Sequence, residues 1–257
     1  MSRLRLPLQL LTVLSAFAMA AGVEFKPQVA TADSYSVNLS MLRQRSIAVS
    51  GIARGDATAG PAVAYNDLAL VQSSTQTGGG TNTTQTAVNS LDLDQLAVAT
   101  SGNATGLDGG KATTGAANAG NLAVVQQTND QSISGSVPSG GVEQTAVNVA
   151  AIGQATTASS GEATATGAVS TASSGDASSL STAIVDQRTR QTYTGPAGGR
   201  SWGSVRQTAT NVATVDQATG AISGRATASV SSTGSSGSAS SSASTRISQG
   251  QTQIGGE

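Results

Sequence analysis

The sequence predicts an all-β protein, a single β-solenoid made of repeats about thirty residues long. Three observations predict this fold: a recurring Gln, an alternation of side-chain character before it, and an almost complete lack of aromatic residues. Aromatics make up 2% of the chain and the hydrophobic fraction is 37%. The recurring Gln appears at Gln44, Gln72, Gln95, Gln127, Gln154, Gln187, Gln217 and Gln249.

The repeats alternate between two types, so the underlying unit is a pair. In the first type the Gln is followed, after three residues, by Ala-x-Ser-Gly, as in Ala99-Thr100-Ser101-Gly102 after Gln95. In the second type another Gln follows four residues later, as in Gln127 and Gln131. Each spacing holds in all four copies of its type. We therefore expect about eight coils, arranged as four double repeats, over residues 34–257.

The residues before each Gln have the periodicity of a strand. Segments 85–95, 144–154 and 207–217 place Gln, Ala, Asn, small or aliphatic residues and Gln at every second position. Alternate side chains of a strand share one face, whereas an amphipathic helix needs apolar residues three and four apart. Abundant Gly, Ser and Thr also disfavour helix. Thirty residues leave two long strands or three short strands per coil as alternatives.

The Asn and Gln residues of this stripe are expected to form ladders. If coils stack about 4.8 Å apart, each amide lies over its equivalent and bonds to it. Such bonds satisfy buried groups that would otherwise each cost about 1–3 kcal/mol. The alternative is a disordered Ser/Thr/Gly chain decorated with amides. The expected ladder residues are Asn38, Gln44, Asn66, Gln72, Gln76, Gln85, Asn89, Gln95, Asn121, Gln127, Gln131, Gln144, Asn148, Gln154, Gln187, Gln191, Gln207, Asn211, Gln217, Gln249 and Gln253.

Gly-rich segments mark the expected corners and loops. Gly-x-Ala-Thr/Ser recurs with a charged or polar residue at x, for example at Gly102, Gly161 and Gly224, and reads as a solvent-facing corner. The spacing between repeats varies most after each second-type copy, which predicts adjustable loops on one edge of the stack. The longest of these loops holds Trp202, which is either a contact residue for sugar or protein or a loop residue folded over the stack.

The amino terminus has the pattern of a secretory signal peptide over residues 1–20, followed by a lead-in at 21–33. Arg3 and Arg5 precede an apolar stretch that ends at the small residues Ala18 and Ala20. A membrane anchor is the alternative, but the stretch is short and holds Pro7. We expect no membrane insertion. Because the chain has no Cys, an exported form has to be stable without disulfides.

The sequence offers few groups for catalysis, so we expect no enzyme and no cofactor. It has no His and no Cys, and hence lacks the commonest general base, zinc ligands and thiolate nucleophile. A calcium site between Asp186 and Asp216 is conceivable, but two exposed carboxylates do not require an ion. The net charge is −1 with 11% charged residues, which predicts no nucleic-acid groove. Arg188 and Arg190 read as a solvated face.

The repeats resemble those of a known family. Asn-x-Ala-x3-Gln, present at Asn121, Asn148 and Asn211, is similar to the second half of the curlin repeat of bacterial functional amyloids. The preceding Gln-x-Ala-x-Asn is one residue shorter than the family's Gln-x-Gly-x2-Asn. The style also resembles Fap-type amyloids and holdfast-anchoring surface proteins. The resemblance implies a secreted, self-associating β-structured protein of the cell surface or biofilm matrix of a Gram-negative bacterium.

The expected function is therefore structural: polymerisation, cell attachment or adhesion outside the cell. The expected partners are the chain itself, through end-to-end assembly, and an outer-membrane secretion pore or a surface polysaccharide. A monomeric β-solenoid adhesin or an ice-binding module is the alternative; outward residues such as Thr145, Val147 and Val149 are too mixed for a regular ice-binding array. A polysaccharide-cleaving β-helix is disfavoured because no acidic or basic cluster is visible.

Overall fold

The computed structural model describes residues 23–24, 28–31, 34–79, 84–135, 141–195, 204–229 and 231–255. In these residues the regular structure is entirely β, and all the strand pairs are parallel. The expected signal peptide (1–20) and Trp202 lie outside the described residues, and of the lead-in (21–33) only 23–24 and 28–31 fall within them. No helix in the described part of the chain is long and apolar enough to cross a membrane.

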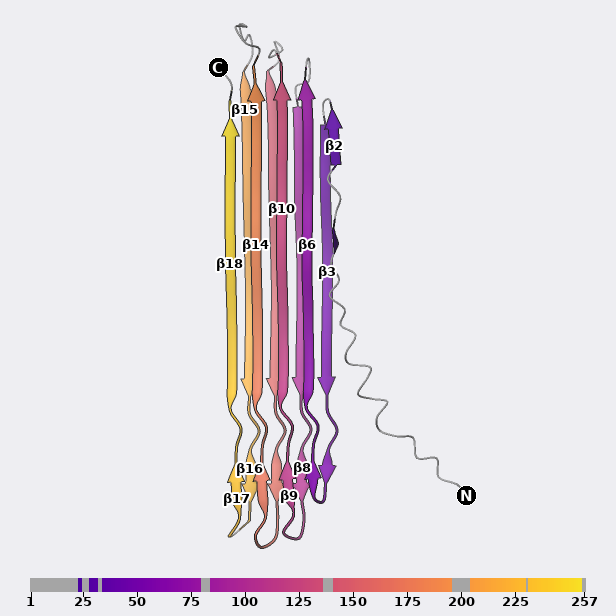
Figure 1. Cartoon of the computed structure of the whole chain (residues 1–257), viewed down its shortest axis with the longest axis vertical. Coiled ribbons are helices and arrows are strands. Elements are labelled where there is room, and N and C mark those ends of the chain that lie inside the picture. The colour runs from indigo at the N-terminus through magenta and orange to yellow at the C-terminus, as the bar shows by residue number, and fades with distance from the viewer. Residues whose placement is uncertain are drawn as a thin grey trace, which may run out of the picture.

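Two sheets of long strands form the body of the molecule (Figure 1). Sheet 1 contains the first-type repeats: β3 (Ser34–Val49), β7 (Thr84–Thr100), β11 (Val142–Ser159) and β15 (Val205–Ile222). Sheet 2 contains the second-type repeats: β6 (Ala62–Gly79), β10 (Ala117–Ser134), β14 (Ala177–Thr194) and β18 (Ala239–Ile254). The period-two alternation of these segments suits extended strands, because alternate side chains then share the inward face.

Two narrow sheets of short strands close each coil at one end. One contains β4 (Ala53–Arg54), β8 (Ala104–Gly106), β12 (Ala163–Ala165) and β16 (Ala226–Ala228). The other contains β5 (Ala57–Thr58), β9 (Lys111–Thr113), β13 (Thr171–Ser173) and β17 (Thr233–Ser235). Strands β5, β8, β9, β12 and β16 begin within the Gly-x-Ala-Thr/Ser segments expected to be corners, so these motifs combine a corner with a short strand, whereas the motif at Gly175 leads into the long strand β14.

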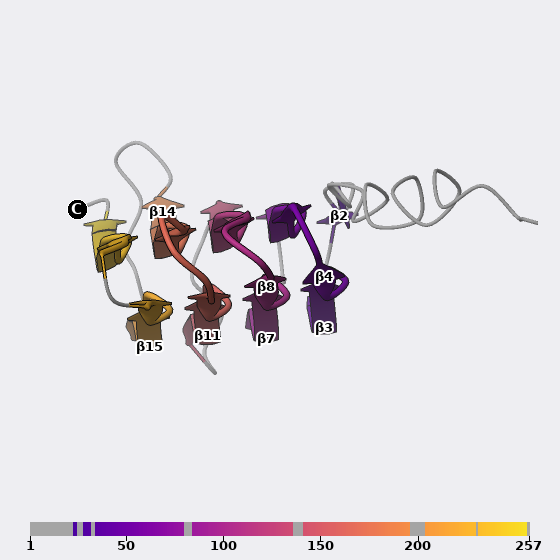
Figure 2. The same ribbon diagram turned by 90° about the horizontal axis from the view of Figure 1, so that it is seen from below.

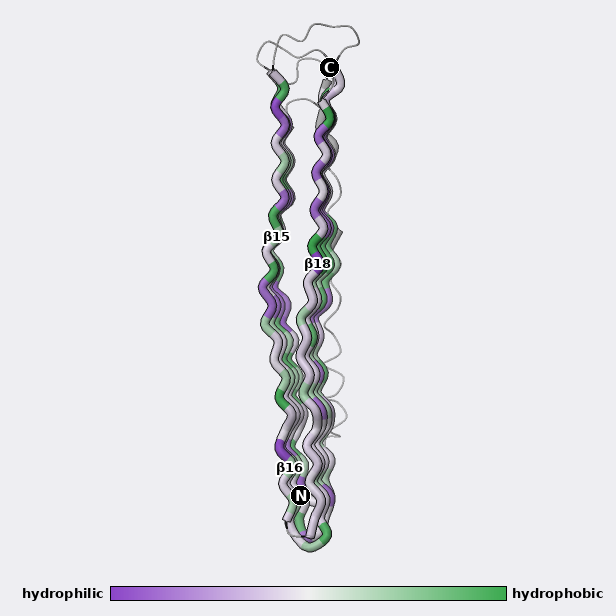
Figure 3. Tube along the Cα trace, turned by 90° about the vertical axis from the view of Figure 1, so that its left-hand side faces the viewer, coloured by the Kyte–Doolittle hydropathy of each residue, from purple (hydrophilic) through white to green (hydrophobic). Residues whose placement is uncertain are grey.

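Each coil therefore consists of two long strands, which run in opposite directions on opposite sides of the core, and two short strands between them (Figures 1 and 3). We call these coils rung 1 (34–79), rung 2 (84–134), rung 3 (142–194) and rung 4 (205–254). Seen along the long strands, the strands stand in two rows, one for each long sheet, and each rung contributes one strand to each row (Figure 2). This arrangement agrees with a β-solenoid.

The eight coils expected from the sequence are four rungs. Gln44 pairs with Gln95, not with Gln72, and Gln72 pairs with Gln127. Repeats of the same type therefore stack on each other, and one coil of the chain contains one repeat of each type. The reason is side-chain matching: the second Gln of the Gln-x3-Gln repeats finds its equivalent only in another repeat of that type.

The core is a thin layer between the two long sheets. Its centre holds Leu68, Leu70, Leu91, Leu93 and Ile152 with the small residues Ala123, Val125, Ala150, Ala183 and Val185. Toward the short strands it is almost purely Ala, as at Ala99, Ala117 and Ala158. Toward the other end lie Ile133, Val142 and Tyr193. Small side chains let the sheets approach closely, which brings the inward amides of one sheet within reach of the other.

The lead-in pairs with the edge of sheet 2. Strand β1 (Val23–Glu24) aligns with Leu70 and Val71 of β6, and β2 (Gln28–Thr31) aligns with Ser74 to Thr77. The end-to-end assembly expected from the sequence therefore meets an edge of β6 that the lead-in already covers in part. The reason is that the extended lead-in can satisfy the backbone groups of β6 that no preceding rung covers.

Candidate functional site

The expected ladder residues lie in six columns that run along the stack. Sheet 1 has columns headed by Gln85, Asn38 and Gln44, and sheet 2 has columns headed by Asn66, Gln72 and Gln76. Every expected ladder residue bonds to the side-chain amide above or below it, at 2.6–3.0 Å. The Asn column of sheet 2 stops at Asn121, because the next two rungs have Ser181 and Ala243 there.

The Gln ladders have a direction. Nε2 of Gln127 donates to Oε1 of Gln72, and Nε2 of Gln187 donates to Oε1 of Gln127. The later rung is always the donor in the Gln columns. The Asn column of sheet 1 runs the opposite way, with Nδ2 of Asn89 donating to Oδ1 of Asn148. A column of this kind ends in unused acceptors on one side and unused donors on the other.

The second N–H of many of these Gln amides joins the two sheets across the core. Gln127 also donates to the main-chain carbonyl of Val149 at 2.8 Å, and Gln154 to that of Thr182 at 3.1 Å. Each such amide therefore links its own rung to the preceding one and to the opposite sheet. Because the amides are almost fully buried, with Gln127 at 0% exposure, this pairing offsets a desolvation cost of about 1–3 kcal/mol each.

One central member of the network, Asn129, was not among the ladder residues predicted from the repeats. It lies between Gln127 and Gln131 with the same inward parity and is fully buried. Its side chain accepts from Asn89 at 2.9 Å and donates to Asn148 at 3.0 Å, so it joins the Asn ladder of sheet 1 from sheet 2. Strand alternation alone placed position 129 inward. No repeat pattern marks this position, because its equivalents are Ser74, Thr189 and Gln251 rather than Asn.

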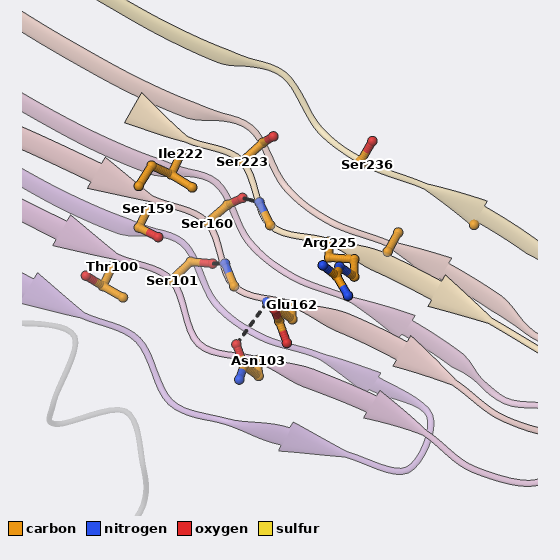
Figure 4. Close-up of a pocket in the computed structure, with 14 residues that line it drawn as sticks. Thr100, Ser101, Asn103, Ser159, Ser160, Glu162, Ile222, Ser223, Arg225 and Ser236 are labelled. Atoms are coloured by element: carbon orange, nitrogen blue, oxygen red, sulfur yellow. Dashed lines mark hydrogen bonds between the residues drawn. The ribbon is translucent and has the colours of Figure 1, made fainter. Parts of the chain in front are cut away.

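The Ser-Gly of the first-type repeats forms a further column, at the corner between long and short strands. The Ser160 hydroxyl accepts from the backbone N–H of Gly224, and the Ser101 hydroxyl accepts from that of Gly161 (Figure 4). A groove runs along this column, and Asn103, Glu162 and Arg225 line it. Its hydroxyls are used within the stack, which makes the column a structural device rather than a reactive site.

Glycine is required in this column by close approach. A Cβ added to Gly161 would lie far inside van der Waals distance of the Gly102 carbonyl, and one added to Gly224 would meet Gly161 in the same way. A second column, Gly115, Gly175 and Gly237, has the same contacts. In both columns the missing Cβ points toward the preceding rung.

The outer faces carry the charges, and they rule out the calcium alternative. Asp186 lies on sheet 2 and Asp216 on sheet 1; both have outward parity, so their carboxylates are on opposite sides of the molecule. Asp186 instead pairs with Arg188 at 2.9 Å. The described residues hold no group of three or more His, Cys, Asp or Glu placed to bind a metal ion.

One carboxyl group has a shifted pKa. The backbone N–H of Ser238 and then its hydroxyl donate to Asp176, at 2.7 and 2.9 Å, and hold the pKa of Asp176 below its ordinary value of 3.8. These bonds join the corner of rung 4 to the corner of rung 3. The carboxyl group of Asp176 is fully exposed, so its effect is limited to these two bonds with Ser238.

The two ends of the stack differ. At rung 4 every residue of β18 is exposed, including the inward Gln249 and Gln253, whereas Gln187 and Gln191 one rung below are 0% exposed. At rung 1 the edge of β3 is unpaired among the described strands, while β1 and β2 cover part of β6. The outward face of β3 also exposes Tyr35, Leu39 and Met41 at 67–73%.

No family model matches this chain, and neither a curated protein nor a solved structure shows detectable similarity to it. The resemblance to curlin repeats therefore rests on the motif residues alone.

Proposed function

We propose that this protein is a secreted structural subunit that associates with itself outside the cell, as an amyloid-like component of biofilm matrix or as a surface anchor in cell attachment. It carries out no catalytic turnover in this role. The observation that carries the proposal is the open rung 4. Its inward Gln249 and Gln253 have the ladder bonds of an interior rung on one side, at 2.7 and 2.9 Å, and solvent on the other.

An open rung of this kind favours addition of another β-layer. Strand edges expose unpaired N–H and C=O groups, and native proteins protect them with charges, Pro or bulges. Strand β18 has one charged residue, Arg246, and no Pro. Its Gln249, Gln251 and Gln253 share one parity, so stacked amides can continue the ladder at the usual spacing of about 4.8 Å.

The remaining features fit a role outside the cell. The signal-peptide pattern of residues 1–20 and the lack of Cys suit export, and the curlin-like Asn-x-Ala-x3-Gln motif suits a bacterial surface amyloid. The proposed setting is the outer surface of a Gram-negative bacterium, reached through an outer-membrane secretion pore, with the chain itself or a surface polysaccharide as partner.

Electron microscopy, fibre diffraction and analytical ultracentrifugation of the purified protein test this function. We expect fibres with a reflection near 4.8 Å and growth that depends on concentration. Gln249→Lys/Gln253→Lys should stop growth because each ammonium would be buried without a partner, and removal of residues 245–257 should slow or abolish it. Ser248→Lys/Thr252→Lys, on the outward parity of the same strand, is the matched control. A stable monomer at all concentrations would contradict self-association.

A monomeric adhesin is the second candidate, and the exposed apolar residues of β3 favour it. Tyr35, Leu39 and Met41 lie on one outward face, whereas the equivalent positions of β7 hold Thr86, Ser90 and Asp92. Adhesion by this face predicts that Tyr35→Ser/Leu39→Ser/Met41→Ser abolishes surface binding of the monomer. The same triple variant should leave fibre growth intact if self-association is the function.

A further inference from the structure

The two ends of the stack are complementary to each other. We propose that rung 4 of one copy receives rung 1 of a second copy in unbroken register, once the second copy's lead-in strands β1 and β2 have left the edge of β6. The inference rests on the proposed self-association and specifies its partner surface. In this register Gln217 meets the second copy's Gln44, and Gln249 meets its Gln72.

The direction of the ladders makes the junction head to tail. At rung 4, Oε1 of Gln249 and of Gln253 accept no hydrogen bond among the described residues. At rung 1, the one bond that Gln44 donates to a described residue goes to the carbonyl of Asp67, which leaves its second N–H without a partner among those residues. Gln72 turns its corresponding N–H to Asn38 O and Ser40 Oγ at 3.2 and 3.3 Å, longer than the 2.6 Å ladder bond that it accepts from Gln127. Donors at one end therefore face acceptors at the other.

Buried hydroxyls without partners support the same register. Among the described residues three buried side-chain oxygens lack a hydrogen bond, and two of them, Ser34 Oγ and Ser74 Oγ, belong to rung 1. In the continued columns Ser34 lies over Gln207 and Ser74 over Gln251. Both amides can pair with these hydroxyls. A buried hydroxyl without a partner is destabilising because it has lost water and gained no bond, so the junction would satisfy two groups that the single chain leaves unpaired.

Two glycines at rung 1, Gly51 and Gly60, have open space on the side where a Cβ would lie, although nothing in the single chain requires this space. A Cβ added to Gly51 meets no described atom within 4 Å, and one added to Gly60 meets only Ser50 Cβ, at 4.0 Å. Their equivalents, Gly102 and Gly115, are tightly packed against the preceding rung. The open side of Gly51 and Gly60 is thus the side on which Gly224 and Gly237 of another copy would stack.

Charge also matches at the junction. The outward column of sheet 1 is Arg43, Asp94, Gly153 and Asp216, in rung order. Continued into a second copy, it sets Asp216 directly beside the second copy's Arg43, as Asp94 lies beside Arg43 within the chain. Opposite charges on neighbouring strands stabilise pairing. A head-to-tail contact of this kind does not close on itself and builds an open filament.

The lead-in holds part of the site that the arriving rung needs. Strand β2 aligns with Ser74 to Thr77, the positions that residues 251–254 of β18 would take, and β1 aligns with those of residues 247–248. Among the described strands, none pairs with the open edge of β3 in sheet 1. A second copy can therefore dock first on sheet 1 and then displace the lead-in from sheet 2, which makes the lead-in a brake on assembly.

The test compares fibre growth rates of four forms of the purified protein, with thermal unfolding as a check on folding. Gly51→Ala/Gly60→Ala should unfold like wild type yet grow at least tenfold more slowly, because the new methyl groups hold the rungs apart. The control Gly220→Ala, an equally open but outward glycine, should grow normally. Val29→Pro/Ala30→Pro, which removes backbone donors of β2, should shorten the lag phase.

Each outcome separates the junction from the proposed function. Wild-type growth by the folded Gly51→Ala/Gly60→Ala variant would overturn the junction and leave self-association standing. Failure of all forms to assemble, including Val29→Pro/Ala30→Pro, would overturn the function itself. A charge exchange gives an independent check: Asp216→Arg should slow growth severalfold, and adding Arg43→Asp together with Asp94→Arg, which keeps opposite charges beside each other in rungs 1 and 2, should restore it. No restoration would count against the register.

Discussion

The side-chain amide of Gln154 donates to Oε1 of Gln95 at 2.7 Å, across 59 residues of sequence. The same bond recurs between Gln217 and Gln154 and between Gln95 and Gln44. Such a ladder holds successive rungs together by buried hydrogen bonds, whereas other proteins rely on a core of large side chains. Each amide is buried only together with its hydrogen-bond partners. It also makes the fold sensitive to the parity of each substitution.

We expect the free-energy cost of introducing a Lys to depend on whether the substituted side chain points into the core or outward. Gln154→Lys or Asn148→Lys should lower the free energy of unfolding by on the order of 3–5 kcal/mol, because an unpaired ammonium would be buried. Thr145→Lys and Val147→Lys, on the outward side of the same strand, should change it little. Chemical denaturation midpoints measure the difference, and equal tolerance at the two pairs would show that the parity is wrong.

Asn129 should matter more than its absence from the repeat pattern suggests. Asn129→Leu removes the bonds that join Asn89 and Asn148 to sheet 2 and should cost about 1–3 kcal/mol of stability. The neighbouring Thr128→Leu, with outward parity, is the control and should be nearly neutral. Urea unfolding of both variants would measure this, and an unchanged midpoint for Asn129→Leu would argue against a cross-core role.

Interior corner glycines should be intolerant of a methyl group. Gly161→Ala places a Cβ against the Gly102 carbonyl, where backbone has to move, and should destabilise by about 1–3 kcal/mol. Gly220→Ala adds the same methyl group in open space. Thermal unfolding of the two variants provides the comparison. If Gly161→Ala unfolds at the same temperature as the wild-type protein, the rungs lie farther apart at this corner than in the structure.

Acid should loosen the corner between rungs 3 and 4. Because the pKa of Asp176 is lowered in the folded protein, its ionised form contributes stability fully above the ordinary pKa of 3.8, and this contribution is lost as pH falls through the lower folded-state pKa. Ser238→Ala should raise the pKa of Asp176 toward 3.8, since one donor is removed. An NMR titration of the carboxyl group measures both, and an identical titration in the variant would contradict the assigned cause.

Much of this fold could be read from the spacing of a few residues. The period-two stripe before each Gln determined that the segments are strands, because alternate side chains share a face whatever the strand pairs with. The same parity identified the amides that bond along the stack. Backbone geometry at this level is local, so a single repeat already contains the information.

Other features depended on which repeats meet. The sequence presents eight similar copies, and only the packed structure shows Gln44 over Gln95 and hence four rungs, since pairing is chosen by the whole strand surface rather than by one motif. The link through Asn129 and the opposite placement of Asp186 and Asp216 likewise arise from two sheets enclosing one core.

The strands, their inward faces and the ladder chemistry thus follow from the sequence, because each depends on periodicity along one segment. The stacking partner of each strand, the lead-in on the edge of β6 and the complementarity of the two ends become visible in the folded structure. Those depend on contacts between residues such as Ser34 and Gln85, or Gln28 and Ser74, whose separation along the chain carries no local signal.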